Sequence, residues 1–243
     1  MKKSWNWKKI LLATGFALLL ALPFTLYYKK QIPMKTDNTI NPYPKLKDPA
    51  AAYIQTASEH YFYREFPQAA ENYRKAIEIY QERKDIHRVA TTYESLADLY
   101  VWASDTAKAE ENYLLAVDFH SRIEDKLGQA NAFKGLADMH MKWDNLQGAE
   151  QRYAEALKLL ESGKPNRVLG SVYEGIGHMH WKAERIPQAI NAFTKAQSTY
   201  RALNYNLGFG HMESVLNRLK KVPGTRHNHA IRKLVPPGQD PSD

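Results

Sequence analysis

Residues 93–116 read YESLADLYVWASDTAKAEENYLLA and contain two short helical patterns separated by Ser104 and Asp105. Apolar and small residues fall at helical spacing in each half: Tyr93, Leu96, Ala97 and Tyr100 in the first, and Ala109, Tyr113 and Ala116 in the second. Each half therefore predicts a helix with one face available for packing. Together, the two halves predict a helix–turn–helix unit.

The same unit recurs at a spacing of 40 residues, once before this stretch and twice after it. The corresponding residues of the first helix are Tyr53, Thr56, Ala57 and His60; Phe133, Leu136, Ala137 and His140; and Tyr173, Ile176, Gly177 and His180. Those of the second helix are Ala69, Tyr73 and Ala76; Ala149, Tyr153 and Ala156; and Ala189, Phe193 and Ala196. Self-similarity at a fixed period predicts a stacked array of repeats.

Local signals agree with this division into helices. Each second helix carries an alanine on either side of an aromatic residue, so we expect close helix packing around a buried ring. Pro67 and Pro187 fall in the first turn of second helices, where proline is tolerated because its missing N–H has no intrahelical partner. Asp105 and Asn145 stand where they can cap the equivalent helices.

These patterns resemble the tetratricopeptide repeat family over roughly residues 49–220. The resemblance implies an all-α fold, a right-handed superhelical array of four helix–turn–helix repeats with a terminal capping helix, within residues 50–221. The period of 40 is longer than the ~34 residues of the common form, which indicates the longer-repeat type. The proline that the family often carries near the end of a repeat is replaced by Ser121, Glu161 and Arg201.

The N-terminal residues 1–28 predict a basic tail followed by a transmembrane anchor. No charged residue occurs from residue 10 to residue 28, and 19 residues of helix span ~28 Å, close to the ~30 Å of a bilayer core. A cleaved signal peptide is the alternative, but no pair of small residues at the spacing that cleavage requires follows the apolar run. We therefore expect the anchor to be retained, giving one transmembrane helix before the array.

The remaining segments are rich in proline. Residues 29–49 contain four prolines and predict an extended linker, while residues 222–243 predict a disordered tail. The net charge of +8 comes from the segments outside the repeats, because residues 50–221 contain 22 basic and 22 acidic residues. A neutral repeat region argues against a nucleic-acid partner.

The resemblance also predicts where a partner binds. In the family, the first helices line a concave groove that accepts an extended peptide or a helix. The corresponding residues here are Ile54, Ser58, Tyr61 and Phe62; Glu94, Asp98, Val101 and Trp102; Lys134, Asp138, Met141 and Lys142; and Glu174, His178, Trp181 and Lys182. Aromatic side chains, methionine and mixed charges are typical of protein-binding surfaces. The alternative is that Trp102 and Trp181 pack against neighbouring helices instead.

One partner class is not expected. Members of the family that grip an acidic C-terminus carry lysine and asparagine at positions where this chain has Glu94, Asp98 and Asp138, and acidic side chains repel a carboxylate.

No catalytic, cofactor or metal site is predicted. The chain has no cysteine, which excludes disulfides and sulfur-based zinc sites. His178 and His180 are two residues apart, so on a helix they face different directions and cannot chelate one ion together. No nucleophile elbow, phosphate-binding loop or HExxH motif occurs, and we therefore expect no enzyme activity.

The sequence thus predicts a membrane-anchored scaffold for protein–protein interaction. We expect a protein or peptide ligand from a membrane or envelope complex, in envelope assembly, secretion or chaperoning. The very short N-terminal tail favours an inner-membrane protein with its repeats in a bacterial periplasm. Two alternatives stay open: a regulatory sensor that faces the cytoplasm and responds to a peptide, and a secreted soluble repeat module.

Overall fold

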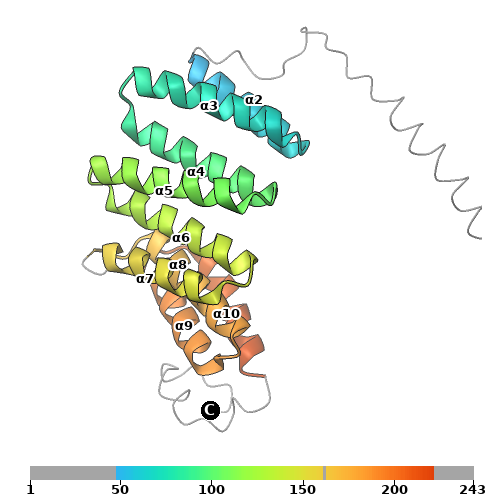
Figure 1. Ribbon diagram of the computed structural model, residues 1–243. Coiled ribbons are helices and arrows are strands. Elements are labelled where there is room, and N and C mark those ends of the chain that lie inside the picture. The colour runs from blue at the N-terminus through green and yellow to red at the C-terminus, as the bar shows by residue number, and fades with distance from the viewer. Residues whose placement is uncertain (1–47, 161–162, 222–243) are drawn as a thin grey trace, which may run out of the picture. The chain divides into compact units, whose positions relative to one another are not determined.

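A computed structural model of the chain describes residues 48–160 and 163–221. These residues form nine α-helices and no strand (Figure 1). The helices are α2 (Pro49–Phe62), α3 (Phe66–Glu82), α4 (Ile86–Trp102), α5 (Thr106–Arg122), α6 (Lys126–Lys142), α7 (Leu146–Leu160), α8 (Arg167–Lys182), α9 (Ile186–Ala202) and α10 (Asn206–Leu219). The predicted all-α repeat array is therefore observed. None of the helices in these two ranges is both long enough and apolar enough to cross a membrane, and the predicted anchor at residues 10–28 and tail at 222–243 lie outside them.

The helices pair in the predicted way. In the order α2–α3, α4–α5, α6–α7 and α8–α9, each pair forms one antiparallel hairpin, and α10 packs against α9. The first helices of successive repeats also touch, because α4 contacts α6 and α6 contacts α8. These first helices, α4, α6 and α8, therefore form a common layer that can carry a continuous surface.

The helix starts confirm the predicted caps. The Asp105 side chain accepts a hydrogen bond from the backbone N–H of Lys108 at 3.2 Å, and the Asn145 side chain accepts one from Gly148 at 2.9 Å. Pro67 and Pro187 lie in the first turns of α3 and α9. The capping side chains accept hydrogen bonds from N–H groups that have no partner inside the helix, and the prolines have no such N–H group.

The helix ends share a feature that the sequence patterns did not predict. Seven of the described connections contain a non-glycine residue with a positive φ between 53° and 60°: Arg64, Lys84, Ser104, Glu124, Asp144, Glu184 and Asn204. At the end of α4, the N–H of Asp105 donates to the carbonyl of Tyr100 at 2.9 Å, the closing bond of a Schellman turn. The left-handed residue before it lets the chain reverse direction within three residues.

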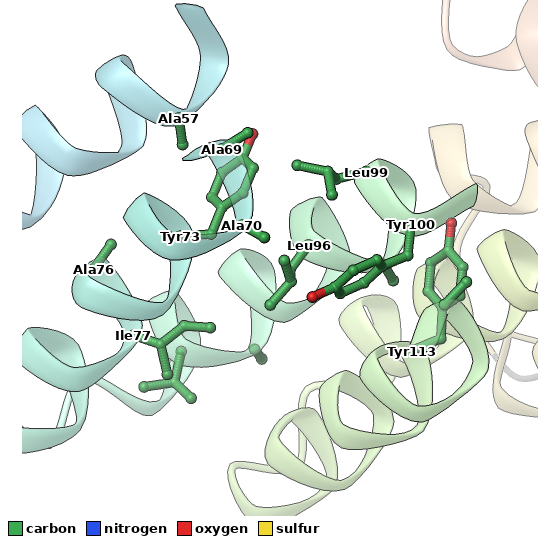
Figure 2. Close-up of a cluster of buried hydrophobic side chains, with 14 of the residues drawn as sticks. Ala57, Ala69, Ala70, Tyr73, Ala76, Ile77, Leu96, Leu99, Tyr100 and Tyr113 are labelled. Carbon is green, nitrogen blue, oxygen red and sulfur yellow. The ribbon is translucent and has the colours of Figure 1, made fainter. Parts of the chain in front are cut away.

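The alanines that recur in the sequence are buried at the helix contacts. Figure 2 shows Ala57, Ala69 and Tyr73 gathered where α2 meets α3, while Leu96 and Tyr100 enter the same cluster from α4. All eight second-helix alanines of the repeat pattern have no exposed surface, and the aromatic residue between each pair is buried. The predicted packing of close alanines around a ring is confirmed.

The terminal helix α10 covers the last repeat, as predicted. Met212, Val215 and Leu219 of α10 are fully buried and pack on Ile190 and Phe193 of α9. Without α10, this apolar face of α9 would meet water.

Candidate functional site

A cleft of about 450 Å³ lies on the layer of first helices, between α4 and α6. Its lining residues are Glu94, Asp98, Val101, Trp102, Tyr113, Asn131, Lys134, Gly135, Asp138, Met139 and Lys142. Seven of these belong to the predicted groove set, so the structure brings the predicted residues of the second and third repeats together. The size falls in the usual range of ligand pockets.

One residue that lines the cleft, Tyr113, comes from the second helix α5. The Tyr113 hydroxyl donates a short hydrogen bond to the carboxylate of Asp98, and Tyr153 makes the same bond to Asp138. A Cβ atom at Gly135 would lie 2.5 Å from the Tyr113 ring. The absence of a side chain at Gly135 therefore lets the tyrosine ring lie against α6 and its hydroxyl reach the groove surface.

Asp98 is an unusual carboxyl group because it is crowded by protein on several sides. Loss of solvent raises the pKa of Asp98, the Tyr113 hydrogen bond acts in the opposite direction, and the nearby charges of Glu94 and Asp138 raise it further. Burial and the Asp98 charge also raise the pKa of Tyr113, so the hydroxyl keeps its proton. The pair is thus a stable donor–acceptor contact rather than a proton-transfer couple.

Glu94 links three helices. Its carboxylate lies 2.9 Å from Nε2 of His120 on α5 and accepts a hydrogen bond of 2.6 Å from the Asn131 side chain on α6. His120 is almost fully buried, and its Nδ1 lies 3.0 Å from the Asp125 carboxylate. Burial alone would lower the pKa of His120, but the hydrogen bond and charge of Glu94 and the charge of Asp125 outweigh it and raise the pKa.

Two predicted groove lysines bind the ends of preceding helices. Lys142 Nζ donates to the carbonyl of Val101 at 2.7 Å, and Lys182 Nζ donates to the carbonyl of Met141 at 2.8 Å. The terminal carbonyls of a helix have no intrahelical donor and carry partial negative charge, so each lysine stabilises the stacking of one repeat on the next. Lys142 also lies 5.1 Å from the centre of the Trp102 ring.

The aromatic residues of the predicted groove differ in exposure. Trp102 is 58% exposed at the rim of the cleft, and Phe62 is 77% exposed. Trp181 is half-buried and packs beside His178 and Phe193, with ring centres 6.3 and 6.4 Å away. Tyr61 is half-buried and packs on Phe66 and the core of the first repeats. Among the tryptophans in residues 48–160 and 163–221, Trp102 is therefore the most available to a partner.

The other predicted residues lie elsewhere along the layer of first helices. Met141 is half-buried and packs on the core around α6–α8, while Glu174 and His178 lie on α8. Glu174 accepts a hydrogen bond of 2.8 Å from the Tyr200 hydroxyl, and His211 of α10 approaches it to 3.4 Å. None of these residues lines the cleft between α4 and α6.

A second cleft of about 370 Å³ lies among α7, α8 and α9. Leu157, Tyr173, Ile176 and His180 contribute to its lining, and no predicted groove residue does. His180 and His178 thus have different surroundings, as their spacing predicts.

Four residues that line the first cleft were not predicted: Tyr113, Asn131, Gly135 and Met139. The repeat pattern predicts only a packing role for Tyr113, because it lies between Ala109 and Ala116 at helical spacing. A signal was present, since the carboxylates at 98 and 138 each precede a tyrosine by 15 residues, a spacing that joins the two helices of one hairpin.

Residues 88–162 match the tetratricopeptide repeat model. This match covers α4 to α7 and so includes the cleft between α4 and α6. No curated protein sequence matches the chain.

Two solved structures show the same kind of helical array. BtubC (BKLC) from P. vanneervenii is 22% identical, with a TM-score of 0.62 over 76% of this chain and 78% of that one. Aspartyl phosphate phosphatase F from Bacillus subtilis is 15% identical, with a TM-score of 0.63 over 78% of this chain. The chain spans 50% of the phosphatase's length. At these identities the likeness shows the fold alone, an array of tetratricopeptide-like repeats.

Proposed function

We propose that the chain is a membrane-anchored scaffold whose cleft between α4 and α6 binds a protein or peptide partner. The observation that carries the proposal is the cleft itself, a hollow of about 450 Å³ with the exposed Trp102 at its rim. A tryptophan that is solvent-exposed before binding can bury a large apolar area against a partner. The match of residues 88–162 to a repeat family with protein partners supports the same role.

The chemistry of the cleft favours a partner segment with both apolar and polar groups. Glu94, Asp98 and Asp138 contribute carboxylates, whereas Lys134 and Lys142 contribute ammonium groups. Most of these charges already have internal partners; for example, Lys134 lies 2.7 Å from Asp138. Apolar burial at Trp102 would therefore supply affinity, and the surrounding charges would select the sequence of the partner.

The anchor and the compartment are part of the proposal. The anchor rests on the uncharged run at residues 10–28, and the periplasmic placement of the repeats rests on the very short tail before that run. A reporter fused after residue 243 that is active only outside the cytoplasm tests this arrangement. Activity of a cytoplasm-only reporter would instead support the regulatory sensor.

Partner binding is tested by replacing Trp102 with a photo-crosslinking amino acid in the full-length, membrane-extracted chain. We expect a discrete crosslinked adduct from this position and none from the same amino acid at Leu114, an exposed residue of α5 outside the cleft lining. Trp102→Ala should abolish co-purification of the adduct's partner, whereas Leu114→Ala should preserve it. Equal crosslinking from both positions would exclude the cleft as the specific site.

Trp102→Ala is a cleaner variant than substitutions at two other predicted groove residues. Trp181 packs on Phe193, and Asp98 accepts the Tyr113 hydrogen bond, so changes at either position would also disturb repeat packing.

A further inference from the structure

Three side chains from α8 and α10 lie close together. Glu174, His178 and His211 each offer one ligand atom, and these atoms all lie within 4.8 Å of one another. Nε2 of His211 lies 3.4 Å from Oε1 of Glu174. Two ligands of one tetrahedral zinc ion lie roughly 3.3 Å apart when each bond is about 2.0 Å long, so this pair already has a suitable separation.

The helical arrangement explains how the three side chains meet. Glu174 and His178 are four residues apart on α8, so they share one helix face. His211 comes from the first half of α10, the helix that packs against α9, and it reaches Glu174 of α8. One ion bound here would join the last complete repeat to the capping helix.

The chemistry of His178 suits metal binding. Within the described residues, neither ring nitrogen of His178 makes a hydrogen bond to the protein. The ring is held by Trp181, nearly parallel at 6.3 Å, and by Phe193, edge-on at 5.0 Å.

Glu174 has the outer support that metal-binding carboxylates usually have. The Tyr200 hydroxyl donates to its Oε2 at 2.8 Å, which leaves Oε1 directed to His211. Such a hydrogen bond orients a metal-binding carboxylate. Two imidazoles and one carboxylate form a common ligand set for Zn²⁺ and leave at least one coordination position open.

The corresponding position in the second repeat has a hydrogen bond in place of the close glutamate–histidine pair. There Glu94 accepts a hydrogen bond of 2.6 Å from Asn131, a pair with the same separation of 37 residues as Glu174 and His211. The residue at the position of His178 is Asp98, which is bound by Tyr113. Compared with the second repeat, the site at Glu174 therefore has His211 in place of the Asn131 amide and His178 in place of the Asp98 carboxylate.

We propose that Glu174, His178 and His211 bind a divalent transition-metal ion of the Zn²⁺ type, which bridges α8 and α10. The site is separate from the cleft between α4 and α6, so the proposal does not depend on partner binding there. Three protein ligands leave at least one coordination position of such an ion for water or a donor group from outside.

The test uses the full-length chain, stripped with a chelator and titrated with Co²⁺ as a spectroscopic substitute for Zn²⁺. We expect the wild type to show the d–d absorption of bound Co²⁺, which Zn²⁺ displaces. His211→Asn is the matched variant, because it copies the Glu94–Asn131 contact and keeps the helices linked. It should weaken Co²⁺ binding at this site at least tenfold, and His178→Ala and Glu174→Gln should do the same.

Tyr200→Phe and His87→Asn serve as comparison variants. Loss of the Tyr200 hydroxyl should weaken binding about tenfold through the orientation of Glu174. His87→Asn, at an exposed histidine of α4, should leave the spectrum unchanged. Circular dichroism confirms that each variant stays folded. Co²⁺ affinity equal in wild type and His211→Asn, or no binding by the wild type, would overturn the proposal.

Discussion

Tyr113 connects three helices. It belongs to α5, its ring lies against Gly135 of α6, and its hydroxyl binds the Asp98 carboxylate of α4. Because the surroundings of Asp98 disfavour its charged form, this one donor contributes more than a hydrogen bond at an open surface. The residue thus links the packing of the repeats to the surface of the cleft.

Removing the hydroxyl should therefore destabilise the array. We expect Tyr113→Phe to lower the free energy of unfolding, measured by urea denaturation, by about 1.5–3 kcal/mol, the range for hydrogen bonds to charged groups. The pKa of Asp98 should rise further, because the lost bond is what lowers it. Tyr73→Phe is the control, since Tyr73 occupies the same position beside the uncharged Ser58 and should lose less. A smaller loss at Tyr113 than at Tyr73 would contradict the argument.

His120 should make the stability of the fold greater at low pH, because Glu94 and Asp125 favour its charged form. Its folded-state pKa lies above the value of ~6.5 that applies in the unfolded chain, so the stabilisation is fully present below pH ~6.5 and is lost as the pH rises through the folded-state pKa. The difference in Tm between wild type and His120→Gln should therefore be larger at pH 6 than at pH 9.

His180 provides the opposite case for the same measurement. Burial and Arg185 lower its pKa, so its contribution is present above pH ~6.5 and is lost as the pH falls through the folded-state value. The Tm difference for His180→Gln should shrink on acidification. If both variants changed with pH in the same direction, the assignment of the His120 shift to Glu94 and Asp125 would be wrong.

At the scale of single helices, two glycines of the first helices occur where a tyrosine ring packs against the helix. Glycine within a helix costs about 1 kcal/mol relative to alanine, yet α6 and α8 carry Gly135 and Gly175 in their middle turns. A Cβ atom would lie 2.5 Å from Tyr113 at the first position and 2.5 Å from Tyr153 at the second. The close approach of a tyrosine outweighs the cost to the helix.

This explanation predicts opposite results at two glycines. Gly135→Ala should lower the free energy of unfolding by about 1–3 kcal/mol, because it overfills a packed contact. Gly210→Ala in α10 should raise it by about 0.5–1 kcal/mol, because no atom beyond the adjoining backbone and chain neighbours lies within 4 Å of the added methyl group. Chemical denaturation of both variants tests this, and stabilisation by Gly135→Ala would refute the role given to the Tyr113 ring.

The sequence predicts the features that lie within one repeat but not the contacts between successive repeats. The helix pairs, the buried alanines and the caps at Asp105 and Asn145 follow from spacing within a single repeat, and the sequence predicts them correctly. The bond from Lys142 to the Val101 carbonyl and the approach of His211 to Glu174 depend on how one repeat stacks on the next. Periodicity within a helix carries no information on that stacking.

The candidate site shows the same division. The family resemblance predicts that Glu94, Asp98 and Trp102 of α4 lie on one groove surface, and the structure gathers them in the cleft. Spacing did not show that Trp181 lies against Phe193, because that contact depends on the α8–α9 packing. The left-handed residues at the helix ends, such as Lys84, were missed because the usual signal there is glycine.

At the scale of the whole array, each repeat contacts only its neighbours, so the two ends differ from the middle. Every interior hairpin is covered on both sides, whereas α9 has only α10 beyond it among the described helices. The burial of Met212, Val215 and Leu219 against α9 therefore closes the core at this end. The array's stability should depend on this one helix.

Truncation tests that dependence. A chain ending at Leu203 should have a Tm at least about 6 °C below that of a chain ending at Lys221, because three buried side chains of α10 together contribute at least about 3 kcal/mol. It should also bind a hydrophobic dye, since Ile190 and Phe193 of α9 become exposed. Both chains end beyond the second helix of the last hairpin, so loss of α10 is the difference between them. Equal Tm values would show that the last repeat is stable without its cover, and the nearest-neighbour description of this end would then fail.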